Sequence, residues 1–250
     1  MIGLRSAAAL AVTETRLFGR EPFAVFFSLA FPLILLLFVG SVGGGVAELP
    51  EGGRFIDGYM AVMVGVTAAN VGLMGMSIHV AENRGQGVLK RYRLSPMPSW
   101  AYFMAQFVTA LIVLVVSIAA LACITILLYG PPTRVNVPVF ILVSLISLYV
   151  TLSFGLLLGG LPLPVRSVQV VSAAVFFLAF FASGAALPRD SFPGWLHRVS
   201  DFNPLTIINE SLMNSYADRP VAWISVFVLV GATFIVNLIT LRTFDWEGNH

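Results

Sequence analysis

Charge is scarce in this sequence, and the scarcity limits the class of protein that it can encode. Asp, Glu, Lys and Arg make up 10% of the 250 residues, whereas 58% of the residues are hydrophobic. An average soluble domain has about 25% charged residues, so a water-soluble globule is excluded. The formal net charge of +2 is too small to indicate nucleic-acid binding. The single cysteine, Cys123, excludes an internal disulfide.

The few charged residues are clustered, and long intervals between the clusters contain none. Six intervals of at least 22 residues lack Asp, Glu, Lys and Arg, and a helix needs about 20 apolar residues to cross the hydrocarbon core of a bilayer. We therefore predict an all-α integral membrane protein with six transmembrane helices in a single domain, residues 1–250. The predicted spans lie within residues 22–47, 58–81, 94–133, 135–165, 167–188 and 220–241.

The positive residues of the connecting segments predict the orientation of the chain. Lys and Arg accumulate in short loops on the cytoplasmic side. With both termini placed inside, the inner segments carry nine of them and the outer segments five. Acidic residues strengthen the difference, with five inside and seven outside. We expect a multi-pass protein of the plasma membrane with both termini in the cytoplasm.

Residues 1–21, which precede the first span, are expected to form an amphipathic helix along the inner headgroup layer. A frayed basic tail is the alternative. A cleavable signal peptide fits poorly, because the apolar stretch from Pro22 to Val39 has 18 residues and the apolar region of a signal peptide has about 7 to 15. At 3.6 residues per turn, three arginines lie on one side of the helix and four apolar residues lie roughly opposite: Arg5, Arg16 and Arg20 against Leu4, Ala7, Ala11 and Phe18.

The sequence also lacks the groups that would power transport from within this chain. Proton- and ion-driven transporters usually carry carboxylates or histidines inside the bilayer, but His79 and Cys123 are the only candidates near the six intervals. The phosphate-binding loop G-x-x-x-x-G-K-[ST] requires a lysine after glycine, and the only lysine, Lys90, follows Leu89. Catalytic motifs such as H-E-x-x-H and G-x-S-x-G are absent. We expect neither an enzyme nor a bound cofactor in this chain.

Two predicted spans have polar faces that could border a substrate path. In span two, Gly58, Gly65 and Gly72 form a stripe where another helix could approach closely, and a Met-rich arc lies on the other side. Span five has an arc of aromatic and small polar residues. Flexible Met and aromatic surfaces can accept amphipathic molecules, but ordinary packing and contact with lipid explain the same residues. The arcs comprise Met60, Met63, Thr67, Asn70, Met74 and Ser77 in span two, and Gln169, Ser172, Phe176, Phe180 and Ser183 in span five.

The segment between spans two and three, residues 82–99, has the composition of a docking loop. Val88, Leu89 and Tyr92 would form an apolar strip on a short helix, and such a strip could enter a groove on a cytosolic partner. Contact between the four positive residues of this loop and anionic lipid headgroups is the alternative.

Two stretches of the chain carry motifs of a known family. The first runs from Glu82 to Pro96. The second begins at Ser183-Gly184 and continues through Leu187-Pro188 and Pro193-Gly194-Trp195-Leu196 to Asn203-Pro204-Leu205. Both resemble the permeases of the ABC-2 type transporter family, which includes drug, lipid and polysaccharide exporters. Both occur in order, together with six predicted spans and an amphipathic leader, so the resemblance covers nearly the whole chain.

The resemblance implies a type V exporter fold. In that fold two six-helix subunits pair, as a homodimer or with a related permease, and each docks a separate ATPase subunit that holds ATP and Mg. Residues 1–21 would be a connecting helix, residues 188–215 would form short re-entrant helices on the extracellular side, and spans two and five would border the path of an amphipathic drug, antibiotic or lipid-like substrate. The ATPase-coupling residues implied by the resemblance are Glu82, Arg84, Gly87, Leu89, Lys90, Arg91, Tyr92 and Arg93.

Other functions stay open at this point. A non-transporting membrane scaffold or assembly protein would also need apolar spans and a basic loop, and a polysaccharide or glycolipid could replace the amphipathic substrate. A passive pore fits poorly, because a pore needs a continuous polar lining and the predicted spans contain only scattered Thr, Ser, Asn and Gln.

Overall fold

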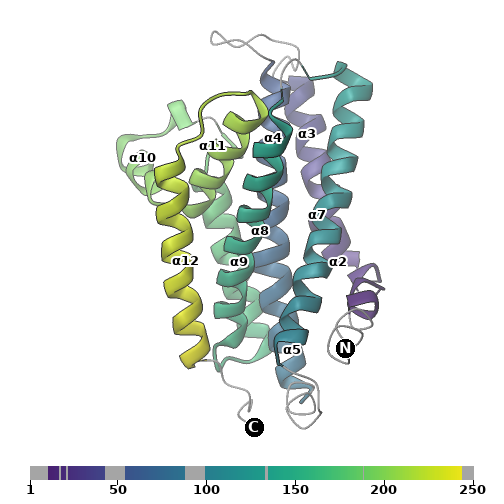
Figure 1. Ribbon diagram of the computed structural model, residues 1–250, viewed down its shortest axis with the longest axis vertical. Helices are drawn as coiled ribbons and strands as arrows, with labels where there is room; N and C mark the ends of the chain where they lie inside the picture. The colour runs from purple at the N-terminus through teal and green to yellow at the C-terminus, as the bar shows by residue number, and fades with distance from the viewer. Residues whose placement is uncertain are drawn as a thin grey trace.

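The computed structural model describes residues 11–16, 18–20, 22–42, 54–87, 99–132, 135–187 and 189–243. Within these ranges every regular element is a helix, which confirms the all-α prediction (Figure 1). In chain order the elements are α2 (Pro22–Val25), η1 (Phe26–Ala30), α3 (Phe31–Val42), α4 (Phe55–Ala69), η2 (Asn70–Met76), α5 (Ser77–Gly85), α7 (Ser99–Tyr129), α8 (Val137–Gly160), α9 (Val165–Ala182), η3 (Arg189–Ser191), α10 (Gly194–Asp201), α11 (Pro204–Tyr216) and α12 (Trp223–Thr243).

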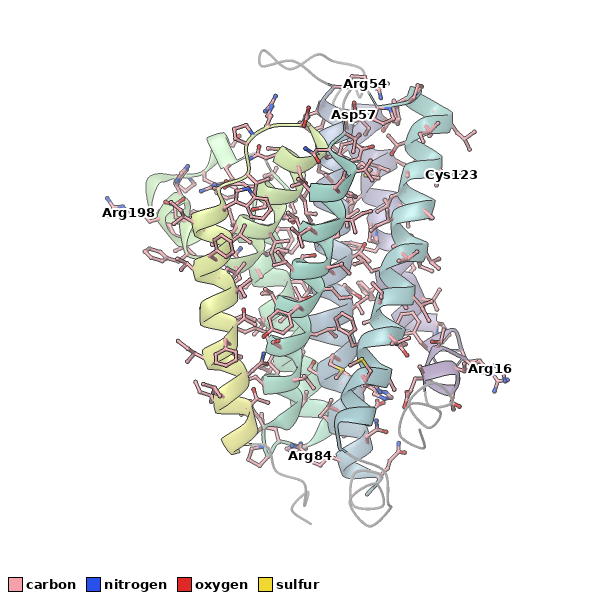
Figure 2. All side chains as sticks on the ribbon, viewed as in Figure 1. Arg16, Arg54, Asp57, Arg84, Cys123 and Arg198 are labelled. Carbon is pink, nitrogen blue, oxygen red and sulfur yellow. The ribbon has the colours of Figure 1, made fainter. Side chains whose placement is uncertain are left out.

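One helix forms the centre of the bundle. The elements α4, η2 and α5 join without a break from Phe55 to Gly85, and 83% of the apolar window in this helix is buried. The corresponding share is 28% for α7 and α9 and 22% for α12, whose outward faces are apolar and exposed, as expected for contact with lipid. The central helix is about 46 Å long at 1.5 Å per residue, so it reaches from one end of the bundle to the other. Figure 2 shows Arg54 at one end and Arg84 at the other; we call these the Arg54 end and the Arg84 end.

Five of the six predicted spans are helices long and apolar enough to cross a membrane. They are the central helix, the Met104–Tyr129 part of α7, α8, α9 and the Trp223–Thr240 part of α12. The first predicted span is the continuous helix α2–η1–α3, whose apolar part, Phe26–Val42, is shorter. The sixth crossing therefore stays a prediction.

Asparagine and proline determine where two of the helices begin. The side chain of Asn136 accepts a hydrogen bond from the amide of Val139 at the start of α8, and a proline occupies the first turn. In α11 the side chain of Asn203 accepts from the amide of Leu205 at 3.1 Å, and Pro204 follows it. Both starts combine an N-cap acceptor with a proline whose missing amide hydrogen costs nothing there.

Glycines bring the central helix into backbone contact with its neighbours. A Cβ on Gly65 would collide with Asn209 of α11, and a Cβ on Gly72 would collide with Thr151 of α8. The contact with α8 is reciprocal, because a Cβ on Gly155 would collide with the carbonyl oxygen of Gly72. The predicted stripe is thus confirmed as a site of close helix approach, but it serves two neighbours, α11 and α8, and not one. The partner glycines Gly155 and Gly159 form a G-x-x-x-G spacing that the sequence analysis missed.

Arg54 fastens the central helix to the turn that precedes α8. Its guanidinium forms two hydrogen bonds with the carboxylate of Asp57, at 3.0 and 2.9 Å, and both side chains are nearly buried, with exposed fractions of 12% and 8%. The same guanidinium donates to the carbonyl oxygens of Tyr129, Gly130 and Pro131. One nearly buried guanidinium therefore supplies hydrogen bonds both to a carboxylate and to the carbonyl groups at the C-terminus of α7.

Residues 189–216 contain short helices, in the region where the extracellular re-entrant helices are predicted. In Figure 1, α10 and α11 lie toward the Arg54 end, and α11 packs between the central helix and α12. Arg189 links α10 to α11 through ion pairs with Asp201 of α10 and Glu210 of α11. The position of these helices relative to a membrane stays a prediction.

The described part of the leader is helical at residues 11–16 and 18. Arg16 and Arg20 are exposed, and the side chain of Arg16 points away from the bundle (Figure 2). Ala11 is buried, and Phe18 packs against the core. The placement of this helix along a headgroup layer stays a prediction.

Candidate substrate path and coupling end

The predicted arc of span two lies inside the bundle of a single chain. Met60, Met63, Thr67, Asn70 and Ser77 are at most 3% exposed, and Met74 is half-buried. Their neighbours are other helices of the same chain, so a substrate could reach them only if those helices move apart. Their role as path residues stays a prediction.

Asn70 connects two π-helices in the middle of the bundle. It begins η2, and its side-chain oxygen accepts a hydrogen bond from Ser28 of η1 at 3.1 Å. The carbonyl oxygen of Ser28 in turn accepts from the hydroxyl of Ser117 of α7 at 3.1 Å. A π-helix bonds i to i+5 and widens the turn, and such turns are frequent at functional sites. Three helices therefore meet in one buried polar contact at the place where two of them depart from α-helical geometry.

The predicted arc of span five is partly joined to the arc of span two. Ser172 of α9 lies 2.6 Å from the hydroxyl of Ser77, and both serines are fully buried. Phe176 and Phe180 are buried and stacked, with ring centroids 6.1 Å apart. Gln169 is exposed and lies apart from this set.

Ser183, the last residue of the span-five arc, belongs to the Arg54 end. It follows α9, is buried, and accepts a hydrogen bond from the side chain of Asn209 at 3.2 Å. The predicted span-five residues therefore lie in three different environments. Gln169 is on an exposed face, Ser172, Phe176 and Phe180 are buried inside the bundle, and Ser183 is at the junction with α11.

At the other end, Arg84 fastens the central helix to the turn between α8 and α9. It is only 6% exposed, and its guanidinium donates to the carbonyl oxygens of Leu161 and Leu163. Gly87, with a φ of +69°, ends α5 in the left-handed conformation that glycine adopts without strain.

The described coupling residues are thus Glu82, Arg84 and Gly87, at the end of the central helix. The others lie outside the described residues: Leu89, Lys90, Arg91, Tyr92 and Arg93.

Comparison with known proteins identifies the family. The family model described as "ABC-2 type transporter" matches residues 6–216, which is most of the chain. The chain belongs to the ABC-2 type transporter family.

Two relatives of this ABC-2 chain are proteins of Escherichia coli strain K12. The probable multidrug ABC transporter permease YbhR is 28% identical over 161 residues, which is 63% of this chain and 44% of YbhR. The inner membrane transport permease YhhJ is 23% identical over 195 residues, 75% of this chain and 52% of YhhJ. The ABC-2 chain thus spans about half the length of each relative.

Proposed function

We propose that this chain is the permease subunit of an ATP-driven exporter, which moves an amphipathic substrate out of the cytoplasm or the inner leaflet. Two copies of the chain would pair, and two copies of a separate ATPase, which hold ATP and Mg, would dock at the Arg84 end on the cytoplasmic side. Family membership supports a permease with an ABC ATPase partner. The name of YbhR, a probable multidrug ABC transporter permease, favours a drug-like substrate.

The continuity of the central helix is the observation that carries this proposal. The segment expected to dock the ATPase follows directly on α5, and α5 continues through η2 into α4 without a break. A displacement of the loop would therefore be transmitted to Ser77 and Asn70 through one continuous helix. The partner supplies the energy only if it binds the moved state more tightly than the resting state.

An aspartate at Leu89 or at Tyr92 should uncouple transport from ATP hydrolysis. Each substitution places a charge on the apolar strip expected to enter the ATPase groove, and a buried unpaired charge is costly. The measurement is ATP-dependent efflux from vesicles that contain permease and ATPase. Leu89→Met and Tyr92→Phe, which keep the strip apolar, are the matched controls and should transport normally.

Efflux that survives both aspartate substitutions would contradict the loop assignment. Failure of the unsubstituted permease to retain any ATPase during purification, together with absence of efflux, would favour a scaffold over an exporter.

Replacing Arg84 by methionine should lower the amount of substrate moved per ATP hydrolysed. The change removes the donors to Leu161 and Leu163, so α5 could move without carrying the α8–α9 turn with it. The measurement is the ratio of efflux to ATP hydrolysis in the same vesicles. Arg198→Met, at an exposed position of α10, is the control and should leave the ratio unchanged. A ratio equal in both variants would show that Arg84 plays no part in coupling.

A further inference from the structure

A pocket with a few polar groups in a mostly apolar lining lies between the leader helix, the central helix and α7, toward the Arg84 end. Its volume is about 70 Å³, which is room for about five water-sized groups. The leader contributes Glu14 and Phe18, the central helix contributes residues of η2 and α5 that include His79, and α7 contributes Gln106 and Thr109. The path residues proposed above do not line it, so it is a separate site.

The charge of the pocket comes from Glu14. This carboxylate is only 7% exposed, and its Oε2 lies 3.0 Å from Nε2 of His79. The same Nε2 atom lies 2.8 Å from the side-chain nitrogen of Asn83, so the imidazole is shared between the carboxylate and an amide. Glu14 and His79 are the ionisable residues among those that line the pocket. A carboxylate that is nearly buried favours a cation beside it.

Gln106 provides a donor without an acceptor. Its side chain is 7% exposed, and its Nε2 atom has no hydrogen-bond partner among the described residues. A buried amide without a partner is unfavourable, and nearly all such groups are satisfied in native proteins. The side chain lines the pocket, so an oxygen atom placed in the pocket would complete its hydrogen bonding.

The remaining lining is apolar and extends toward the middle of the bundle. Val71 and Met76 of the central helix, Val113 of α7 and Leu152 of α8 contribute to it. Polar groups at one end and an apolar wall at the other match a molecule with a small polar head and an apolar body.

We propose that this pocket binds the head of a cationic amphiphile that carries a protonated amine next to an oxygen acceptor. The ammonium donates to Glu14, the neighbouring oxygen accepts from Nε2 of Gln106, and the apolar body leaves along Val71 and Val113. A 2-aminoethanol head has four heavy atoms, which fits the volume. An anionic head would lie against the Glu14 carboxylate, and a neutral head would bring no cation to it. Binding at this pocket does not depend on the proposed export function. The interpretation of the pocket as an entry site for substrate does rest on that function.

Equilibrium binding to the purified permease tests the site without ATP or ATPase. The protein is placed in phosphatidylcholine nanodiscs, and the probe is a fluorescent long-chain 2-amino alcohol. The matched diol, in which a hydroxyl replaces the amine, should bind at least about tenfold more weakly, because a charge-assisted hydrogen bond is lost. Glu14→Gln should weaken binding of the amino alcohol by a similar factor. Glu210→Gln, a carboxylate change at the other end of the bundle, should leave it unchanged.

A second substitution tests the amide donor separately. Gln106→Met should weaken binding of the amino alcohol but not of a plain long-chain alkylamine, which has no oxygen for Gln106 to reach. This pattern cannot arise from a general loss of structure, and the comparison of amine with diol on the unsubstituted protein holds even if Glu14→Gln fails to fold.

Equal binding of amine and diol would overturn the proposal, as would unchanged binding in Glu14→Gln. Absence of saturable binding to the unsubstituted protein would overturn it too. If ethanolamine phospholipids in the nanodisc displace the probe, the natural occupant is a lipid headgroup; if they do not, it is a soluble amphiphilic amine. Failure of binding rejects the pocket alone, whereas failure of the loop substitutions to uncouple efflux rejects the coupling assignment alone.

Discussion

Replacing Gly155 by alanine should lower the free energy of unfolding by about 2–3 kcal/mol, the upper part of the range for an overpacked core. The new methyl group would collide with the carbonyl oxygen of Gly72. The Gly72 backbone cannot relieve this clash by a rotamer change, as a flexible side chain could. Helices α8 and η2 would therefore have to separate and lose the contacts between them. Thermal or denaturant unfolding of the permease in detergent measures the change.

Gly231 offers a control with the opposite expected sign. A Cβ at this position of α12 would meet nothing within 4 Å, so Gly231→Ala should raise stability by up to about 1 kcal/mol through helix propensity alone. Two identical chemical changes would then have opposite effects. Equal effects at both positions would contradict the close approach of α8 to η2.

Replacing Asp57 by alanine should destabilise the fold by about 3–5 kcal/mol, the cost of leaving one member of a buried ion pair without the other. Arg54 would keep its carbonyl contacts but lose both hydrogen bonds to the carboxylate. The measurement is again the free energy of unfolding, compared with that of the unsubstituted permease.

The ion pair of Arg189 with Asp201 provides the comparison for Asp57. Asp201 is about half exposed, and exposed pairs contribute about 1 kcal/mol or less. Asp201→Ala should therefore have a small effect. A loss in Asp57→Ala no larger than in Asp201→Ala would show that Arg54 is held by the carbonyl oxygens of Tyr129, Gly130 and Pro131 alone.

The absence of charge was sufficient to locate five spans. Five of the six intervals free of Asp, Glu, Lys and Arg coincide with a long apolar helix, because unpaired charge inside the hydrocarbon is too costly to occur by chance. The criterion says nothing about where within an interval a helix begins. It also treats Asp57 as a boundary, although Asp57 lies in the first turn of α4 and is buried beside Arg54.

A helical projection correctly predicts which residues share a face only where the helix is regular. Gly58 and Gly65 both face α11, but Gly72 lies inside η2 and faces α8. A π-turn holds more residues than an α-turn, so positions after Asn70 are rotated relative to a projection drawn at 100° per residue. No residue pattern in the sequence marked this departure.

The pocket at Glu14 could not be predicted from the sequence. Glu14 and His79 are separated by 64 residues, and Gln106 by a further 26. Nothing in the spacing of three such distant residues indicates contact. Burial of a carboxylate in the leader depends on how that helix packs against α5 and α7, which only the three-dimensional arrangement supplies.

The two arginines at opposite ends of the central helix have a common consequence. Arg54 holds the turn before α8 and Arg84 holds the turn after it, while Gly72 and Gly155 touch between them. Helix α8 and the central helix are therefore attached at three levels. A covalent cross-link between α5 and α8 would accordingly be a neutral way to immobilise the protein for structural work.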